Sequence, residues 1–188
     1  METGKKNFVS LEYAADFLKE NDNFVILTHQ NPDGDTLGSG FGLAMVLDRL
    51  GKKSTVICSD EIPQKYEYFT SLAPQNADLS KKTTIVAVDV ADSKLLGNLE
   101  QKYASEVELC IDHHISNIGY AKATYLDSNA AANCECIYDL AGALAVDVDK
   151  DIALALYTGI STDTGCFRFS NTTAKTLRIG ADLMEIGI

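Results

Sequence analysis

The amino-acid sequence predicts an α/β fold in which a mostly parallel sheet has helices on both faces. Short segments that are apolar at almost every position, such as 24–28, 84–88 and 107–111, alternate with longer segments of helical pattern. Strands of this kind are typical of parallel sheets that are buried on both faces. Ligands of such sheets bind beyond the carboxyl ends of the strands, so the fold class also predicts where a functional site should lie.

The first expected element is a short amphipathic helix over 9–20, capped by Ser10 because its hydroxyl can accept a hydrogen bond from the first turn. A glycine-rich helix follows at about 35–50. Its Gly-Ser-Gly-Phe-Gly segment at 38–42 lacks the spacing of a dinucleotide-binding loop, so we expect close helix packing there. Pro63 opens a short helical stretch near 63–71. The other expected elements are strands at 24–28, 53–58, 84–88, 107–111 and 120–126 and helices near 93–103, 131–143, 149–158 and 173–186.

The charge balance restricts the class of partner. The 188 residues carry a formal net charge of -11. This disfavours a protein that holds long duplex nucleic acid on a broad basic surface, because Lys and Arg contacts to phosphate supply most of such affinity. A small phosphorylated nucleotide or a short oligonucleotide remains a suitable substrate, since divalent cations in an acidic pocket can supply the positive charge.

The sequence also gives an expectation of location. No apolar run approaches the roughly 20 residues that cross a membrane, and residues 1–6 lack the apolar core of a signal peptide. The 5 cysteines are odd in number and form no Cys-x-x-Cys pair, which favours packing of reduced thiols over a disulfide framework or a zinc ribbon. We therefore expect a cytoplasmic protein without a membrane partner.

The first candidate motif follows the strand expected at 24–28. His29 opens a segment that also contains Asp33 and Asp35, and Pro32 and Gly34 turn this loop so that the two carboxylates can point differently. Imidazole mixed with hard oxygen ligands suits Mn²⁺ or Fe²⁺, and Mg²⁺ or Zn²⁺ less predictably. The alternative is an Asx-turn in which Asp33 or Asp35 caps the following helix.

Two further strand ends carry similar residues. Asp112, His113 and His114 follow 107–111, and Asp89 follows 84–88. Adjacent side chains of extended chain point in opposite directions, so at most one of the two imidazoles is expected to bind a given ion, and the other could face substrate. The alternatives are a solvated polar strand end and, for Asp89, a helix cap. If Asp89 is buried, it needs a charged partner such as a cation.

Four motifs, in this order, resemble those of the DHH phosphoesterase superfamily. They are His29-x-x-Pro32-Asp33-Gly34-Asp35, Asp89, Asp112-His113-His114 and Ser161-Thr162-Asp163-Thr164-Gly165-x-Phe167, and together they span roughly residues 20 to 180. From the sequence, Asp163 lies in a loop after a helix. Within the superfamily the chain resembles the stand-alone bacterial nanoRNase/pAp phosphatases, since it starts almost at its first helix.

The resemblance implies two Mn²⁺ ions, with Mg²⁺ or other divalent ions as alternatives. The first ion would be held by His29, Asp33 and Asp89. The second would be held by Asp35, Asp89, His113 and Asp163, so that Asp89 bridges the two. The catalytic residues would be His114, which contacts the substrate phosphate, and Asp112, which supports it. Arg168, the basic residue nearest to the fourth motif, either binds substrate phosphate or forms a surface ion pair.

The implied reaction is hydrolysis of phosphate esters of short oligoribonucleotides or 3′,5′-bisphosphonucleosides by a hydroxide that the two ions generate. A cyclic-dinucleotide or linear-dinucleotide phosphodiesterase and a non-catalytic nucleotide-binding module remain alternatives. Family members usually carry a carboxyl-terminal DHH-associated domain with a Gly-Gly-Gly-His segment, which does not occur in this sequence. We therefore expect 1–188 to be a catalytic metal-binding domain without the substrate domain, and a homodimer is compatible with it.

Overall fold

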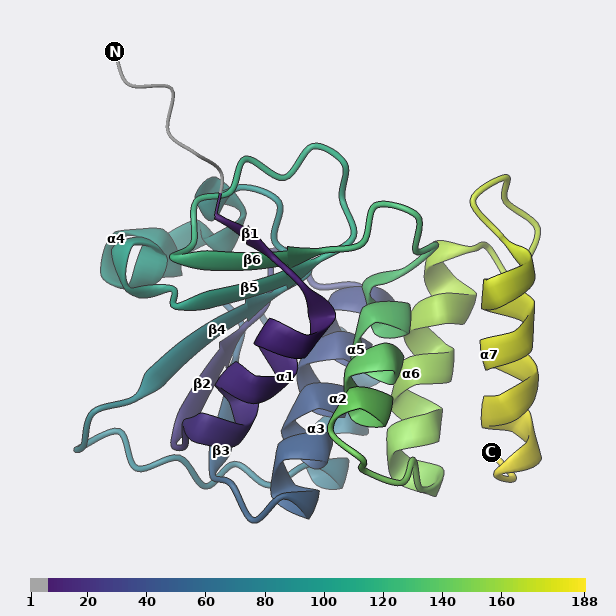
Figure 1. Cartoon of the computed structure of the whole chain (residues 1–188), viewed down its shortest axis with the longest axis horizontal. Helices are drawn as coiled ribbons and strands as arrows, with labels where there is room; N and C mark the ends of the chain where they lie inside the picture. The colour runs from purple at the N-terminus through teal and green to yellow at the C-terminus, as the bar shows by residue number, and fades with distance from the viewer. Residues whose placement is uncertain (1–6) are drawn as a thin grey trace.

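A sheet of six parallel strands forms the centre of the computed structural model, which describes residues 7–188; the segment 1–6, discussed above for its lack of a signal peptide, lies outside it. The strand order is β1-β6-β5-β4-β2-β3, and each pairing is parallel (Figure 1). The predicted α/β class is therefore confirmed. The strands are β1 (Phe8–Val9), β2 (Phe24–Leu27), β3 (Ser54–Ile57), β4 (Thr84–Val88), β5 (Leu109–Asp112) and β6 (Ala123–Leu126).

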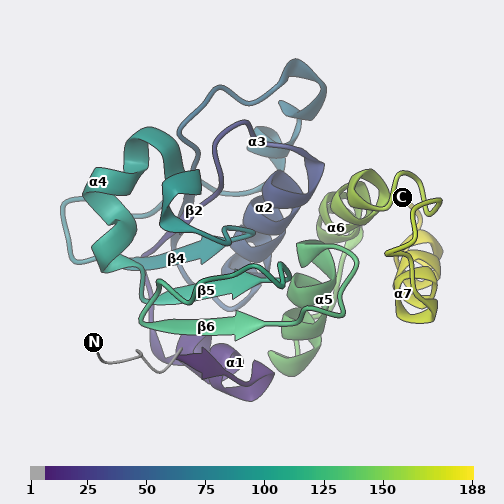
Figure 2. The ribbon, with the colours of Figure 1, turned by 90° about the horizontal axis from the view of Figure 1, so that it is seen from above.

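Helices cover both faces of the sheet unequally. The larger core lies between the sheet and α1, α2, α3, α5, α6 and α7, whereas the smaller core on the other face includes Leu96 and Tyr103 from the segment around α4. Figure 2 shows α4 apart from the α2, α5 and α6 group, with α7 outermost. The helices are α1 (Leu11–Glu20), α2 (Gly34–Arg49), α3 (Phe69–Leu72), α4 (Glu100–Tyr103), α5 (Asn133–Ala143), α6 (Lys150–Asp163) and α7 (Ala174–Glu185), and the 3₁₀ segments are Gln64–Tyr66, Ser93–Leu99 and Ala104–Glu106.

Several predicted elements have other bounds in the structure, and the first helix and the segment at 93–103 are two of them. The first helix starts at Leu11, because Val9 belongs to β1, whose two residues are too few to show a strand period; the Ser10 cap is confirmed, its hydroxyl accepting from the Tyr13 amide at 3.3 Å. The single helix expected over 93–103 is wrong. Gly97 adopts a left-handed φ of 58° there, and a Cβ at this position would lie 2.9 Å from the Gln30 side chain. Gly97 therefore interrupts the helix within the 3₁₀ segment Ser93–Leu99, and α4 follows from Glu100.

The register of β2, β4 and β5 brings the carboxyl ends of these strands to the same height in the sheet. Leu27 of β2 lies opposite Ala87 of β4, and Val88 lies opposite Ile111 of β5. Continuing this register by one or two residues places His29, Asp89 and Asp112 at one height beyond the sheet. The sheet therefore brings three of the four sequence motifs to a single edge.

The glycines of α2 allow α6 to pack unusually close, as the 38–42 segment predicted. A Cβ on Gly38 would lie 2.5 Å from the Ala155 carbonyl oxygen, and one on Gly42 would lie 2.9 Å from Leu156. Gly34 faces Thr162 in the same way, so the two helices run antiparallel. This packing places the amino-terminal turn of α2 beside the carboxyl-terminal turn of α6.

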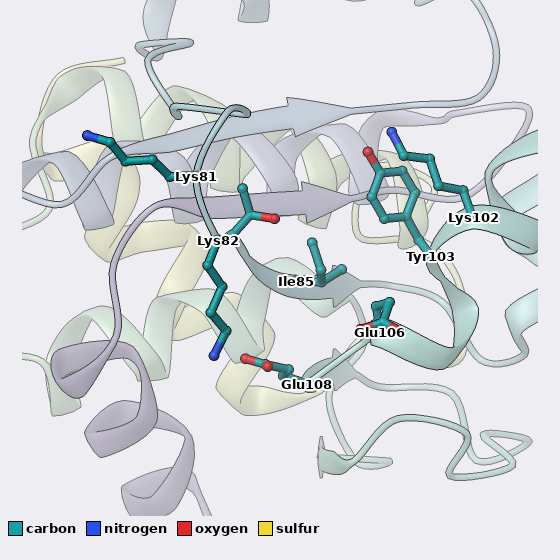
Figure 3. A pocket seen from close by; sticks show the side chains of 8 residues that line it. Lys81, Lys82, Ile85, Lys102, Tyr103, Glu106 and Glu108 are labelled. Atoms are coloured by element: carbon teal, nitrogen blue, oxygen red, sulfur yellow. The ribbon is translucent and has the colours of Figure 1, made fainter.

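A pocket of about 340 Å³ opens at the other end of the strands (Figure 3). Ile85 near the start of β4 forms part of its wall, and lysine and glutamate side chains surround it. Since Asp89 and Asp112 lie at the carboxyl ends of β4 and β5, this pocket is separate from the sequence motifs. The lining residues are Lys81, Lys82, Thr83, Ile85, Lys102, Tyr103, Glu106 and Glu108.

Within 7–188, no helix combines the length and apolar character that crossing a membrane requires.

The close contact of α2 with α6 leads to a stability prediction. Gly38→Ala should lower the free energy of unfolding by about 1–3 kcal/mol, because the added methyl meets backbone that cannot move aside. Gly142→Ala in α5 is the matched control, since nothing lies within 4 Å of its Cβ position; it should raise stability by about 0.5–1 kcal/mol. Urea unfolding of both variants checks this, and equal stability of the two would contradict the packing argument.

Candidate metal centre

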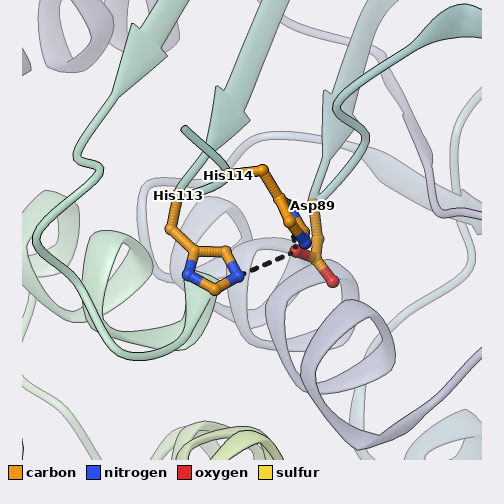
Figure 4. A group of neighbouring side chains, drawn as sticks. All are labelled: Asp89, His113 and His114. Carbon is orange, nitrogen blue, oxygen red and sulfur yellow. Dashed lines mark ion pairs between the residues drawn. The ribbon is translucent and has the colours of Figure 1, made fainter. Parts of the chain in front are cut away.

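The side chain of Asp89 lies at the centre of the motif residues. It follows β4 and is only 3% exposed. Three imidazole nitrogens lie 3.5 Å from its carboxylate: Nε2 of His29 from Oδ2, and Nε2 of His113 and Nδ1 of His114 from Oδ1 (Figure 4 shows the last two). Its Oδ1 is buried without a hydrogen-bond partner among the described residues. A buried carboxylate of this kind needs a cation beside it.

The backbone at Asp89 is also unusual. Its φ of 60° lies in the left-handed region, which costs a non-glycine residue roughly 1–2 kcal/mol. The Asp89 amide donates to the Ile111 carbonyl at 2.9 Å, which fixes this turn against β5. Strained backbone that neighbouring structure holds in place is concentrated at functional sites.

One group of possible metal ligands consists of His29, Asp33 and Asp89. His29 Nε2 lies 3.7 Å from Asp33 Oδ1 in addition to its 3.5 Å approach to Asp89. Its Nδ1 lies 2.7 Å from the Gln30 carbonyl oxygen, which can only accept, so Nδ1 carries a proton and Nε2 faces the carboxylates. Metal-binding histidines are oriented in this way.

A second group consists of Asp35, His113 and Asp163. His113 Nδ1 donates to the Ala130 carbonyl at 3.1 Å, and Nε2 lies 3.8 Å from Asp35 Oδ2 and 3.7 Å from Asp163 Oδ2. Because Nε2 is also 3.5 Å from Asp89, the two groups adjoin through Asp89. The structure thus brings together all six residues that the sequence proposed as ligands; that they bind metal remains a prediction.

Asp33 and Asp35 have different surroundings. Asp33 is the N-cap of α2, where its Oδ1 accepts from the amides of Asp35 and Thr36, so this residue caps the helix and also lies in the first group of possible ligands. Asp35 is 1% exposed and accepts from the amides of Asn133 and Cys134 at 2.6 and 2.9 Å. The first turn of α5 therefore holds Asp35, a contact that sequence reasoning missed because the two segments are far apart in the chain.

The expected direction of the two adjacent imidazoles is wrong. β5 ends at Asp112, so His113 and His114 do not alternate as in extended chain. Their ring centroids are 4.4 Å apart, and both rings face Asp89. His114 Nδ1 donates to Oδ1 of the fully buried Asp112 at 2.8 Å. The side chain of His114 is 41% exposed, which leaves it within reach of a ligand.

The fourth motif is placed differently from the prediction. Asp163 is the last residue of α6 and does not lie in a loop; the helix continues past 158, and the hydroxyls of Thr158 and Thr162 donate to carbonyls of the preceding turn. Arg168 lies on the exposed loop that follows, and its Nε donates to the Gly165 carbonyl at 2.8 Å. Of the two alternatives for Arg168, the surface ion pair is not found among residues 7–188, and the phosphate contact remains a prediction.

The crowded acidic groups change several pKa values in the chain without metal. Burial, together with the charges of Asp89 and Asp163, raises the pKa of Asp35 well above its ordinary value. Burial alone would lower the pKa of His29, but the carboxylates of Asp33 and Asp89 outweigh it and raise the pKa to about 11. The hydrogen bond that His114 donates to Asp112 raises the pKa of His114 to about 9. Protons therefore compensate the charge that a metal ion would otherwise neutralise.

Comparison with known proteins gives several relatives that match most of the chain. A protein of Thermus thermophilus named "Bifunctional oligoribonuclease and PAP phosphatase NrnA" is 34% identical over 168 residues, which cover 87% of this chain and 50% of the relative. The Bacillus subtilis protein of the same name is 27% identical over 87% of this chain and 53% of its own length. The chain thus spans about half the length of these curated relatives.

The chain is also similar to a more distant relative in sequence and to a solved structure in fold. A Streptococcus thermophilus protein named "Probable manganese-dependent inorganic pyrophosphatase" is 23% identical over 86% of this chain and 54% of its own length. The crystal structure of an exopolyphosphatase-related protein from Bacteroides fragilis superposes with a TM-score of 0.84 at 24% identity, covering 95% of this chain and 56% of that one.

The family model described as "DHH family, N-terminal domain" matches residues 23–160. This range contains the first three motifs and ends just before Asp163. Because the match covers well over half of the 188 residues, and because the motif side chains converge as described, the chain belongs to the DHH family.

Proposed function

We propose that this chain is the metal-binding catalytic part of a manganese-dependent phosphoesterase that acts on short oligoribonucleotides or 3′,5′-bisphosphonucleosides. The convergence of three histidines on the buried carboxylate of Asp89, whose Oδ1 has no hydrogen-bond partner among the described residues, carries this proposal. The names of the Thermus thermophilus and Bacillus subtilis relatives support the hydrolase class and the kind of substrate.

The side chains fit a pair of divalent ions. His29, Asp33 and Asp89 would hold one ion, and Asp35, Asp89, His113 and Asp163 the other. In His29 and His113, Nδ1 is committed to a backbone carbonyl and Nε2 faces the carboxylates, so neither imidazole must turn to bind. Carboxylate and imidazole ligands suit Mn²⁺, and the Streptococcus thermophilus relative is named for manganese.

Bound divalent ions would lower the pKa of a water molecule and neutralise charge on the phosphoryl oxygens. The chain itself supplies an oriented acid. Because His114 Nδ1 is committed to Asp112, Nε2 is the nitrogen available to substrate, and a proton at this atom can stabilise a phosphate oxygen or pass to the leaving oxygen. Asp112 is fully buried and keeps the imidazole in this orientation.

The acidic surface agrees with a small substrate. With a net charge of -11, the chain depends on its bound ions to attract phosphate, and we propose no site for long duplex nucleic acid. Arg168, exposed beside the fourth motif, is the candidate side chain for a further phosphate contact. We propose that a second domain, outside these 188 residues, completes the substrate cleft, as the doubled length of the relatives suggests.

A substrate panel with Mn²⁺ tests the proposed function. We expect phosphate or mononucleotide release from pAp and from di- to pentanucleotides, measured by chromatography, and complete loss after chelation with EDTA. Preferential cleavage of cyclic dinucleotides would support the phosphodiesterase alternative. Preferential cleavage of pyrophosphate would support an activity like the one for which the Streptococcus thermophilus relative is named. No bound Mn²⁺ even at millimolar concentration, together with no turnover of any compound, would identify a non-catalytic binding module.

Asp89→Ala should lower metal content more than loss of any other single ligand, because Asp89 adjoins both groups. Loss of a residue that only supports a ligand costs about 10- to 100-fold in metal affinity, so loss of a shared ligand should exceed about 100-fold. Isothermal titration with Mn²⁺ measures this. Asp16→Ala, an exposed aspartate on α1, is the matched control and should bind as wild type. Wild-type affinity in Asp89→Ala would reject the shared-ligand assignment.

Metal binding should release protons. His29, with a pKa raised to about 11, is protonated at pH 7 in the metal-free chain, and a metal ligand must be neutral. Mn²⁺ affinity should therefore increase as pH rises through the neutral range. Calorimetry at pH 7 in buffers of different ionisation enthalpy counts the protons, and His29→Gln should release about one fewer than wild type. Equal proton release by the two proteins would show that Nε2 of His29 is not a ligand.

A further inference from the structure

We propose that Asn117 is a positioning residue for the reaction: its amide holds the Asp112 carboxylate, and Asp112 in turn orients His114 toward the substrate phosphate. The inference deepens the proposed function and rests on it for the role of His114. Asn117 lies outside the four sequence motifs, and neither its residue type nor its spacing predicts a function.

Asn117 occupies one side of the Asp112 carboxylate, and the histidines occupy the other. Its Nδ2 donates to Asp112 Oδ2 at 2.6 Å. The second oxygen, Oδ1, accepts from His114 Nδ1 at 2.8 Å and from the amides of His113 and His114 at 2.9 and 3.3 Å. Asp112 and Asn117 are both fully buried. With donors on both oxygens, the carboxylate has one orientation.

Asn117 is itself held by the loop that carries the histidines. Its Oδ1 accepts from the Gly119 amide at 2.7 Å, and its backbone amide donates to the His114 carbonyl at 2.9 Å. Nδ2 also lies 3.4 Å from the carbonyl oxygen of Val90, the residue after Asp89. One amide side chain therefore connects the histidine loop, the Asp112 carboxylate and the turn that carries Asp89.

The chemistry of an amide is what this position requires. It donates to a carboxylate while accepting from a backbone amide, which neither a carboxylate nor an apolar side chain does. Without the donor, a buried oxygen of Asp112 loses its partner, and the carboxylate gains freedom to turn about the donors that remain on Oδ1. The hydrogen bond between Asp112 and Nδ1 determines which nitrogen of His114 is available to substrate. Rotation of the carboxylate therefore changes the orientation of Nε2 relative to the reacting phosphate.

The experiment compares Asn117→Ala with Asn117→Leu, which fills a similar volume without a donor, in the 188-residue chain. We expect Mn²⁺ content to stay as in wild type and kcat on the substrate identified by the panel to fall about 10- to 100-fold, with KM changed less than about threefold. Adding either substitution to His114→Ala should cause no further loss of kcat, because both act through one imidazole. Asn21→Ala is the control: its amide donates to the Phe17 carbonyl at 2.8 Å, far from the cluster in sequence, and it should react as wild type.

A second measurement does not depend on turnover. In ¹⁵N NMR spectra of the Mg²⁺-loaded protein, His114 should show a protonated Nδ1 in wild type, and both variants should lose this single state. Wild-type spectra in both variants, losses of kcat that add to that of His114→Ala, or a loss in Asn117→Ala that Asn117→Leu restores would each overturn the proposal. If wild type cleaves no compound of the panel, the proposed function fails while the spectra still decide the role of Asn117.

Discussion

The buried carboxylate of Asp89 at the end of the central strand is the constraint on which the rest of the site depends. β4 lies between β2 and β5, so the strand ends that carry His29 and His113 flank Asp89. A negative charge that is 3% exposed and has an unpartnered oxygen is unfavourable unless a cation neutralises it. The left-handed backbone at Asp89 adds to this cost. The fold therefore maintains, through its sheet, a position that becomes favourable only when positive charge is present.

The packing of α2 against α6 positions the candidate metal ligands that the sheet does not carry. The close approach of α2 to α6 depends on Gly34, Gly38 and Gly42, since a Cβ at each would meet α6. Because the helices are antiparallel, Asp35 in the first turn of one lies near Asp163 in the last turn of the other. Stability of the helix layer and geometry of the candidate metal centre thus depend on the same small residues. The amides at the start of α5 then fix Asp35 by compensating its charge.

The residues around Asp112 impose a second kind of constraint, which fixes the orientation of the His114 imidazole and does not involve an uncompensated charge. Asp112 is fully buried, yet every oxygen has a donor, so it needs no cation and serves to fix His114. Asp89 and Asp112 follow neighbouring strands and have the same side chain, but only Asp89 retains an unpartnered oxygen. This difference separates a candidate ligand from a supporting residue more clearly than residue type can.

The sequence by itself determined the parallel sheet, the order of most elements and the side chains that collect at its carboxyl edge. These follow from local patterns: apolar strands, caps and polar residues at strand ends. Only the tertiary structure decided that His113 and His114 face the same carboxylate, that Asp163 ends a helix, and that α5 and Asn117 hold Asp35 and Asp112. Each of these depends on contacts beyond the local pattern, from a loop that leaves the strand geometry to segments distant in the chain, and periodicity carries no information about them. The candidate ligands could therefore be chosen from the sequence, whereas the interactions that orient them required the fold.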